Sequence, residues 1–174
     1  MKSATLLTAL GAALDKRFND ATAPPVGGVA GPVQYRPGLL VPALDWDQCS
    51  MLWITAGRRW RSSTFPALNE VQTCDGSLIL EATVGVARCS TAFGDVNGHP
   101  PSLDTLAAEM DAQEDDKDRL EAAVCGAMAG MKRDLLITQW SRGPVEAQGP
   151  EGATVAVYIT LLAEMTPAGL AGAR

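Results

Sequence analysis

Few residues in this sequence have the types and spacing that catalysis requires. The one histidine, His99, lies in a turn rich in glycine and proline, with no second histidine to help it. A catalytic or metal-binding histidine needs partners that orient it or complete a ligand set. Asp95 and Asn97 look like the start of a calcium loop, but the glycine and glutamate required later in that loop are missing. We therefore expect no enzyme, metal or cofactor; the alternative, a small hydrolase or ligand-binding domain, depends on His99, Asp95 and Cys89.

The four cysteines are too far apart in the sequence for a zinc ribbon, a CxxC redox pair or an iron–sulfur cluster. They are Cys49, Cys74, Cys89 and Cys125. Metal-binding cysteines typically come in closely spaced pairs. We expect four reduced side chains, and a Cys74–Cys89 bridge between neighbouring strands stays open as the alternative.

A basic and aromatic cluster follows a strand-like segment. It consists of Arg58, Arg59, Trp60 and Arg61. Such side chains can stack on nucleic acid or pair with it. The whole chain, however, carries 20 acidic and 14 basic residues, a net charge of -6, which disfavours a general nucleic-acid-binding surface. A solvated or inter-subunit strand end is the favoured interpretation.

An acidic cluster lies within a predicted helix. It consists of Glu114, Asp115, Asp116 and Asp118. Several carboxylates this close together usually form a solvated helix face, because an acid–base pair needs burial to tune its protonation. The pattern therefore gives no support for catalysis.

The stretch from Leu78 to Met131 reads as a strand, a turn-rich loop and a long helix. Apolar residues alternate along residues 78–86, as in a half-buried strand. Ser102 then lies where its hydroxyl can cap a helix. Apolar residues recur every three or four positions at both ends of the helix, as Leu103, Leu106, Met110, Leu120, Val124, Ala127 and Met131. We expect Leu106, Leu120 and Val124 to be buried.

An N-terminal helix is expected over residues 3–19, followed by a long irregular connection. Leu6, Leu10, Leu14 and Phe18 share one helical face. The connection, residues 21–44, is crowded with prolines and glycines that prevent regular structure. Connections of this length are usually functional or disordered. We predict that residues 23–44 are ordered mainly by contacts between subunits, with a flexible linker as the alternative.

Three further segments read as strands. Residues 48–62 are apolar on both faces, which is typical of a central strand. Residues 135–140 alternate until Gly143 and Pro144 mark a break, and residues 153–161 alternate most clearly. The order of elements favours an α+β fold, with an N-terminal helix and one long helix packed on a mainly antiparallel sheet of four or more strands.

Length and composition fit one domain. A chain of 174 residues with 47% hydrophobic content can bury a sizeable core, so residues 1–174 are treated as a single domain with a flexible tail from about residue 166. The sequence contains no run of 18 apolar residues and no secretory pattern. Neither a membrane span nor a signal peptide is expected.

A succession of short motifs runs over residues 37–102. In chain order they are a Pro-Gly, an Asp-x-Cys, an Arg, a Phe-Pro, a Cys, an Arg-Cys, an Asp and a Pro-Pro-Ser, formed by Pro37, Gly38, Asp47, Cys49, Arg61, Phe65, Pro66, Cys74, Arg88, Cys89, Asp95, Pro100, Pro101 and Ser102. Over residues 37–165 the chain resembles the neck proteins of long-tailed actinobacteriophages, which are tail terminator or head-to-tail connector subunits. The resemblance implies a structural virion protein of α+β fold, assembled in the host cytoplasm, with no catalytic residues.

The resemblance also implies partners. A tail terminator forms a ring, commonly a hexamer, that caps the tail tube and meets the head-side connector proteins, while DNA passes through the lumen without specific binding. Another adaptor or stopper subunit of the neck is the alternative. Our candidates for the subunit interface are Tyr35, Arg36, Leu39, Leu40, Arg58, Arg59 and Trp60. Our candidates for an acidic lumen lining that repels phosphate are Glu114, Asp115 and Asp116.

Overall fold

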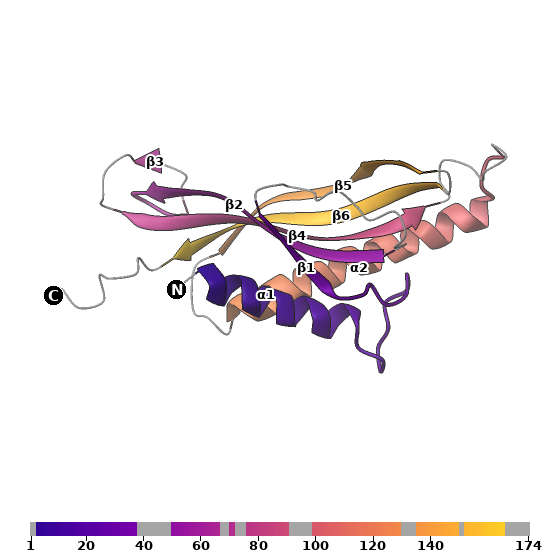
Figure 1. Ribbon diagram of the computed structural model, residues 1–174, viewed down its shortest axis with the longest axis horizontal. Coiled ribbons are helices and arrows are strands. Elements are labelled where there is room, and N and C mark those ends of the chain that lie inside the picture. The colour runs from indigo at the N-terminus through magenta and orange to yellow at the C-terminus, as the bar shows by residue number, and fades with distance from the viewer. Residues whose placement is uncertain are drawn as a thin grey trace.

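The structure is a computed structural model, and it describes residues 3–37, 50–66, 70–71, 76–90, 99–129, 135–149 and 152–165. The elements in chain order are α1 (Ser3–Phe18), β1 (Val33–Pro37), β2 (Ser50–Ser62), β3 (Glu70–Val71), β4 (Ser77–Ser90), α2 (Leu103–Ala129), β5 (Leu135–Gly149) and β6 (Gly152–Met165). Both helices lie on one face of a long twisted sheet (Figure 1). The expected α+β fold is confirmed.

The described strands form one sheet in the order β1-β2-β4-β6-β5, and the short β3 pairs with the end of β2. All neighbours are antiparallel except β1 and β2, which run parallel. β2 therefore lies inside the sheet, as its two apolar faces predict. Its Leu52 and Ile54 join the core beneath the helices, and Met51 and Trp53 are buried on the opposite face.

Two prolines lie in strands where the sequence predicts irregular structure. β1 occupies part of the Pro/Gly-rich connection and ends at Pro37, and β5 continues through Gly143 and Pro144, which face Ala156 and Val155 of β6. The expected irregularity of residues 33–37 and the expected break in β5 are both wrong. The physical reason is position, because β1 and β5 are the outer strands of the described sheet, where proline's missing N–H need not interrupt a ladder on both sides.

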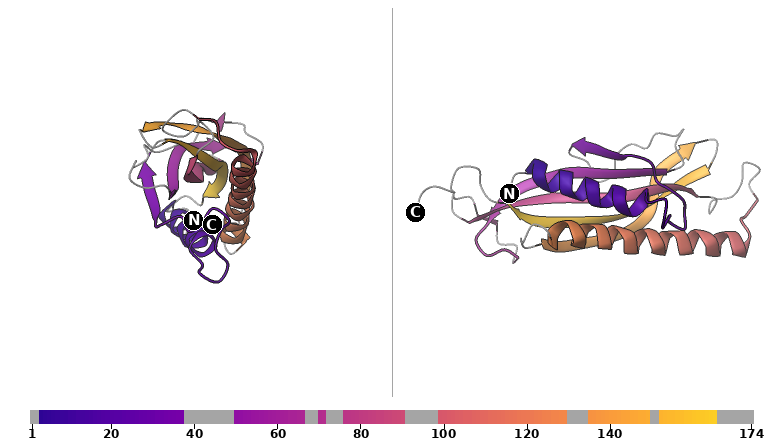
Figure 2. Two further views of the ribbon diagram at one scale, coloured as in Figure 1. Left: turned by 90° about the vertical axis from the view of Figure 1, so that its right-hand side faces the viewer. Right: turned by 90° about the horizontal axis from the view of Figure 1, so that it is seen from below.

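The core lies between the two helices and the middle of the sheet. Leu6, Leu10, Leu14 and Phe18 of α1 are fully buried, which confirms the predicted face of that helix. They pack with buried residues of α2, β4 and β6, among them Leu120, Val124, Val84 and Ile159. The two helices lie side by side beneath the sheet (Figure 2).

The N-terminal half of α2 departs from the predicted burial. Ser102 caps the helix as expected, its Oγ accepting a hydrogen bond from the Thr105 N–H at 3.1 Å. Leu103 and Met110, however, are 84% and 53% exposed, and Leu106 is only half-buried. The expectation that Leu106 is buried is therefore wrong. The cause is the shorter α1, which lies beside the C-terminal half of α2 and leaves the other half extending past it (Figure 2).

The cysteines differ from the expected reduced state. Cys89, near the end of β4, is disulfide-bonded, whereas Cys125 on α2 is an exposed free thiol. The prediction of four reduced cysteines is wrong at Cys89. That prediction came from the spacing of the cysteines and from an expected reducing compartment, and neither shows which thiols the fold brings together. Cys49 and Cys74 lie outside the described residues.

Neither described helix combines the length and the apolar character that crossing a membrane requires.

Candidate interaction site

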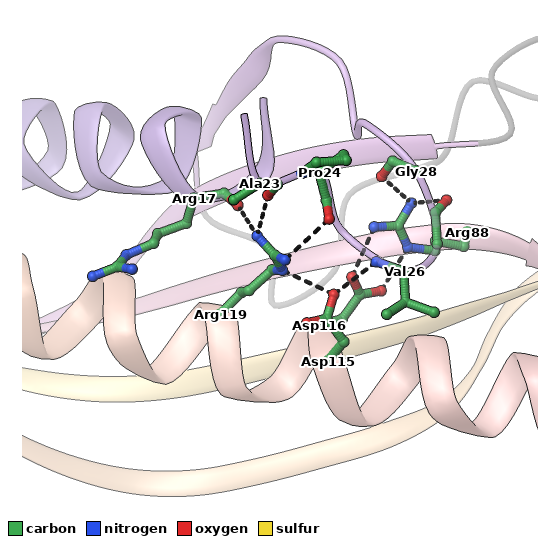
Figure 3. Close-up of polar contacts among 10 residues, drawn as sticks. Arg17, Ala23, Pro24, Val26, Gly28, Arg88, Asp115, Asp116 and Arg119 are labelled. Atoms are coloured by element: carbon green, nitrogen blue, oxygen red, sulfur yellow. Dashed lines mark hydrogen bonds and ion pairs between the residues drawn. The ribbon is translucent and has the colours of Figure 1, made fainter. Parts of the chain in front are cut away.

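Two arginine–aspartate pairs lie along α2, one of them with β4 and the other within the helix (Figure 3). Arg88 of β4 donates from Nε and Nη2 to the two carboxylate oxygens of Asp116, at 2.6 and 2.7 Å. The Asp116 side chain is only 1% exposed. On the same helix, Arg119 lies four residues after Asp115 and donates from Nε to its carboxylate at 2.8 Å. The two-point contact between Arg88 and Asp116 is the stronger geometry, because both N–H groups of the fork are matched by an oxygen.

Arg119 also binds the loop that connects α1 to β1, residues 19–32, called the α1–β1 loop below. Nη1 of Arg119 donates to the carbonyl oxygens of Arg17, in the last turn of α1, and of Ala23, in the loop, at 2.7 and 3.0 Å. Its Nη2 donates to the carbonyl oxygen of Pro24 at 3.2 Å. A segment rich in proline and glycine has few backbone partners of its own, so the guanidinium supplies donors that these carbonyls otherwise lack.

Arg88 and Asp115 hold the next part of the same loop. Arg88 Nη1 donates to the carbonyl oxygens of Gly27 and Gly28, at 2.7 and 3.0 Å. The carboxylate of Asp115 accepts a hydrogen bond from the Val26 N–H at 2.9 Å. The loop is therefore attached to α2 at several points within one subunit (Figure 3).

These contacts all lie within one subunit. The prediction that residues 23–44 are ordered mainly by neighbouring subunits is therefore wrong for residues 23–37. Pro25 and Ala30 are buried in their own subunit, and Asn19 Nδ2 donates to the Gly31 carbonyl at 2.8 Å. The physical reason is that side chains distant in the sequence satisfy the loop's backbone. Residues 38–44 lie outside the described part of the chain.

The acidic lumen candidates have three different environments. Glu114 is exposed and lies 3.7 Å from the Lys117 ammonium, while Asp115 is half-buried against Arg119. Asp116 is buried inside the subunit and is not available to line a lumen. Burial raises the pKa of the Asp116 carboxyl above its ordinary value, and the hydrogen bonds from Arg88 oppose this rise.

A groove of about 690 Å³ opens where the N-terminal half of α2 passes over the ends of β4 and β6. Val157 contributes apolar lining, and Asp104, Glu109 and Gln113 line it from α2. The Ser90 hydroxyl donates to Glu109 at 2.6 Å. The Gln113 Oε1 atom is buried and has no hydrogen-bond partner among the described residues. The groove thus presents acceptor groups beside an apolar surface, and the Arg88 guanidinium in its wall is already bound to Asp116.

The predicted interface residues of β2 form a basic end to the sheet. The Arg58 guanidinium lies 4.6 Å from the centre of the Trp60 ring, which is a cation–π distance. Arg59 donates to the Ser3 hydroxyl at 2.7 Å, and Arg61 donates to the Gly76 carbonyl at 3.1 Å. A register shift between Ala56 and Arg59 separates this end from the regular part of β2.

The other interface candidates lie on or after β1. Tyr35 is 54% exposed, yet its hydroxyl reaches α1, since a Cβ added at Gly11 would lie 1.9 Å from that oxygen. Arg36 is exposed and donates to the Gln34 side chain at 2.8 Å. Leu39 and Leu40 lie outside the described residues.

The residues of the hydrolase alternative do not form a cluster in the described structure. His99 is exposed just before α2, Cys89 is disulfide-bonded, and Asp95 lies outside the described residues. Within the described ranges no group of three or more His, Cys, Asp or Glu side chains is arranged to hold a metal ion.

Sequence reasoning missed Arg88, Arg119 and Gln113 as site residues. The sequence contains a signal for each of them. Arg119 follows Asp115 by four positions, the spacing of a helical ion pair. Arg88 has the same strand parity as Val84 and Val86, and a charged side chain on the core face requires a buried partner. Gln113 continues the three–four spacing of Leu106 and Met110, which places a polar side chain on the apolar stripe of the helix.

Comparison with known proteins adds no relative: no protein-family model matches the sequence, and no curated protein matches it either. The features of the molecule that bear on its function are therefore the arginine pairs that hold the loop, the groove beside α2 and the basic end of β2.

Proposed function

We propose that the chain is a structural subunit of a bacteriophage neck, a tail terminator that forms a ring. One observation carries this proposal. Several residues of the motif succession that the structure describes make contacts that hold the fold together. Arg88 holds the α1–β1 loop and Asp116, Ser102 caps α2, and Cys89 is disulfide-bonded. Motif residues that serve the architecture are typical of a protein whose role is assembly, whereas an enzyme's motifs converge on a reacting centre.

The proposed ring caps the tail tube and meets the head-side connector proteins, with DNA passing through its lumen. The net charge of -6 supports passage without tight binding, because phosphate contacts by lysine and arginine supply most non-specific affinity for DNA. An adaptor or stopper subunit in another layer of the neck uses the same properties and is the closest alternative.

The test combines native mass measurement with electron microscopy of the purified protein at micromolar concentration. A ring of defined subunit number is expected, and it should bind the ends of purified tail tubes. A single-subunit mass across the concentration range, together with failure to bind tail ends, would refute the proposal.

A ligand-binding function has one observation in its favour, the groove of about 690 Å³ beside α2. This size is within the range of small-molecule sites. A ligand-binding function predicts a monomer whose melting temperature rises when a small ligand is added. The native mass measurement distinguishes this monomer from a ring.

A further inference from the structure

The charge of this protein is distributed very unevenly between its elements. α2 contains eight acidic and two basic residues, so its net charge of -6 equals that of the whole chain. β2 contains three arginines, Arg58, Arg59 and Arg61, and no acidic residue. The subunit therefore carries separate negative and positive regions.

These two regions lie at opposite ends of the molecule. Ser50, at the start of β2, pairs with Arg88, which contacts the middle of α2. Arg59 and Arg61 pair with Leu80 and Leu78 at the other end of β4. With a rise of about 3.3 Å per residue, Ser50 and Arg59 are separated by about 30 Å. Figure 1 shows the tip of β2 and the start of α2 at opposite ends of the long axis.

The groove at the acidic end suits a long cationic side chain. Gln113 Oε1 is a buried acceptor that lacks a donor, and Asp104 forms no ion pair in the described part of the chain. Ala108 and Ala112 leave room along α2, and Val157 adds apolar lining. An arginine offers an apolar stem to such a surface and several N–H donors to its acceptors.

The basic end can supply such a side chain. Arg59 and Arg61 donate only to the neutral oxygens of Ser3 and Gly76, and within the described residues neither is paired with a carboxylate. Trp60 is half-exposed beside them and adds a flat aromatic surface. Exposed arginine and tryptophan are the residue types most enriched among energetically important interface residues.

We propose that two copies of this chain bind head to tail, with the Arg58–Arg61 end of one copy seated in the groove formed by α2, β4 and β6 of the next. An arginine of this end contacts Asp104 and Glu109 and donates to Gln113 Oε1. The inference rests on the proposed ring and names the surfaces that build it. Because the two surfaces differ, each copy in such a pair keeps one of its two surfaces free, and repetition of the contact gives a ring if the rotation closes.

Charge reversal tests the contact in two variants. The first carries Arg59→Glu and Arg61→Glu, and the second carries Asp104→Arg and Glu109→Arg. Each variant alone presents like charges at both surfaces and should need at least a ten-fold higher concentration to assemble. Mixed in equal amounts, the variants restore opposite charges at every contact. The mixture should therefore reassemble with the two variants alternating, which native mass measurement detects as an equal number of each.

Matched controls separate this specific contact from a general effect of charge. Asp118→Arg with Glu121→Arg makes the same charge change on exposed residues of α2 outside the groove lining, and it should assemble as the wild type does. Lys16→Glu with Arg17→Glu is the corresponding control on α1. Circular dichroism confirms that each variant is folded. If the second variant does not fold, Asp104→Arg alone takes its place in the mixture.

The outcomes distinguish the two proposals. The head-to-tail contact is overturned if both charge-reversed variants form rings as the wild type does. It is also overturned if both variants are folded but their mixture stays unassembled. In either case the proposed ring itself still stands. A wild type that stays a single subunit overturns the proposed ring itself.

Discussion

Asp116 shows how a buried partner changes the role of a single acidic residue. Its neighbours Glu114 and Asp115 are partly or fully accessible, yet Asp116 is 1% exposed and bonded at both oxygens to Arg88. A buried ion pair of this kind adds little net stability by itself, but removing one partner leaves a buried charge without compensation. Replacing the acidic cluster with lysine, as a test of a lumen lining, would therefore disrupt the subunit first.

Arg88→Met is predicted to destabilise the subunit in a pH-dependent way. At neutral pH the free energy of unfolding should fall by about 3 to 5 kcal/mol, because Asp116 stays buried without its guanidinium. Burial already raises the pKa of Asp116 above its ordinary value of 3.8, and the variant loses the hydrogen bonds that lower it. The folded variant thus holds this proton more tightly than the unfolded chain does, so its loss of stability should shrink as the pH falls through the raised pKa toward 3.8.

Urea unfolding at a series of pH values measures this effect. Arg36→Met is the matched control, since Arg36 is exposed and within the described residues bonds only to Gln34, and it should change stability by less than about 0.5 kcal/mol. A loss at Arg88→Met that stays constant over the acidic range would contradict the assigned role of Asp116.

Gln113→Leu is predicted to separate folding from assembly. The substitution removes a buried acceptor that has no partner among the described residues, so the free energy of unfolding should not fall. Assembly should weaken, because the incoming arginine loses an acceptor. Thermal unfolding and native mass measurement on one sample check both parts, and a destabilised but fully assembling variant would show that Gln113 serves the fold alone.

At the scale of elements, α2 consists of two halves with different surroundings. Its C-terminal half packs against α1 and the sheet, and its N-terminal half extends beyond α1 (Figure 2). Leu120→Ala should therefore cost about 2 to 5 kcal/mol, the range for a buried leucine. Leu103→Ala, the same substitution at a side chain that is 84% exposed, should cost less than about 0.5 kcal/mol. Chemical denaturation compares the two, and equal losses would contradict the division of the helix.

The α1–β1 loop depends on Arg119, and proteolysis should report this dependence. Arg119→Met removes the donors to Arg17, Ala23 and Pro24, so a protease of broad specificity should cut the loop several-fold faster. Arg17→Met is the control, because it truncates an exposed side chain beside the loop and leaves the backbone carbonyl in place. Cutting that is equally fast in wild type and both variants would mean that other contacts hold the loop.

The sequence predicted the elements whose signals are local. The periodicity of Leu6, Leu10 and Leu14 identified α1, alternation identified β4 and β6, and apolar residues on both faces identified β2. It failed for β1 and for Pro144, because the fit of a proline in a strand depends on whether that strand lies at a sheet edge.

The candidate site was less predictable, because its contacts are distant in the sequence. Arg88 and Asp116 are 28 residues apart, and Arg119 and Ala23 are 96 residues apart. No local pattern specifies that such residues meet. The exposed basic residues of β2 are neighbours on one strand. A local sequence pattern could therefore identify them as interface candidates.

At the scale of the whole molecule, the separation of charge predicts that assembly depends on salt. The proposed contacts of Arg59 and Arg61 with the acidic groove are between charged groups, and the screening length for such groups falls from about 30 Å at 0.01 M to about 3 Å at 1 M salt. Sedimentation should show rings at low salt and smaller species at high salt. Assembly that strengthens with salt would indicate an apolar contact instead.

The position of β6 between β4 and β5 has a consequence for synthesis of the chain. β4 is made early, but its pairing with β6, from Leu78 opposite Met165 to Ser90 opposite Ala153, cannot be complete until residue 165 has been added. The 75 residues between Ser90 and Met165 take roughly 4 to 15 s to translate at about 5 to 20 residues per second. During that interval β4 has one unpaired edge and apolar side chains on both faces, which is a hazard for aggregation. A nascent chain stalled before β6 should therefore be a strong substrate for chaperones, and its release from them should depend on the arrival of this strand.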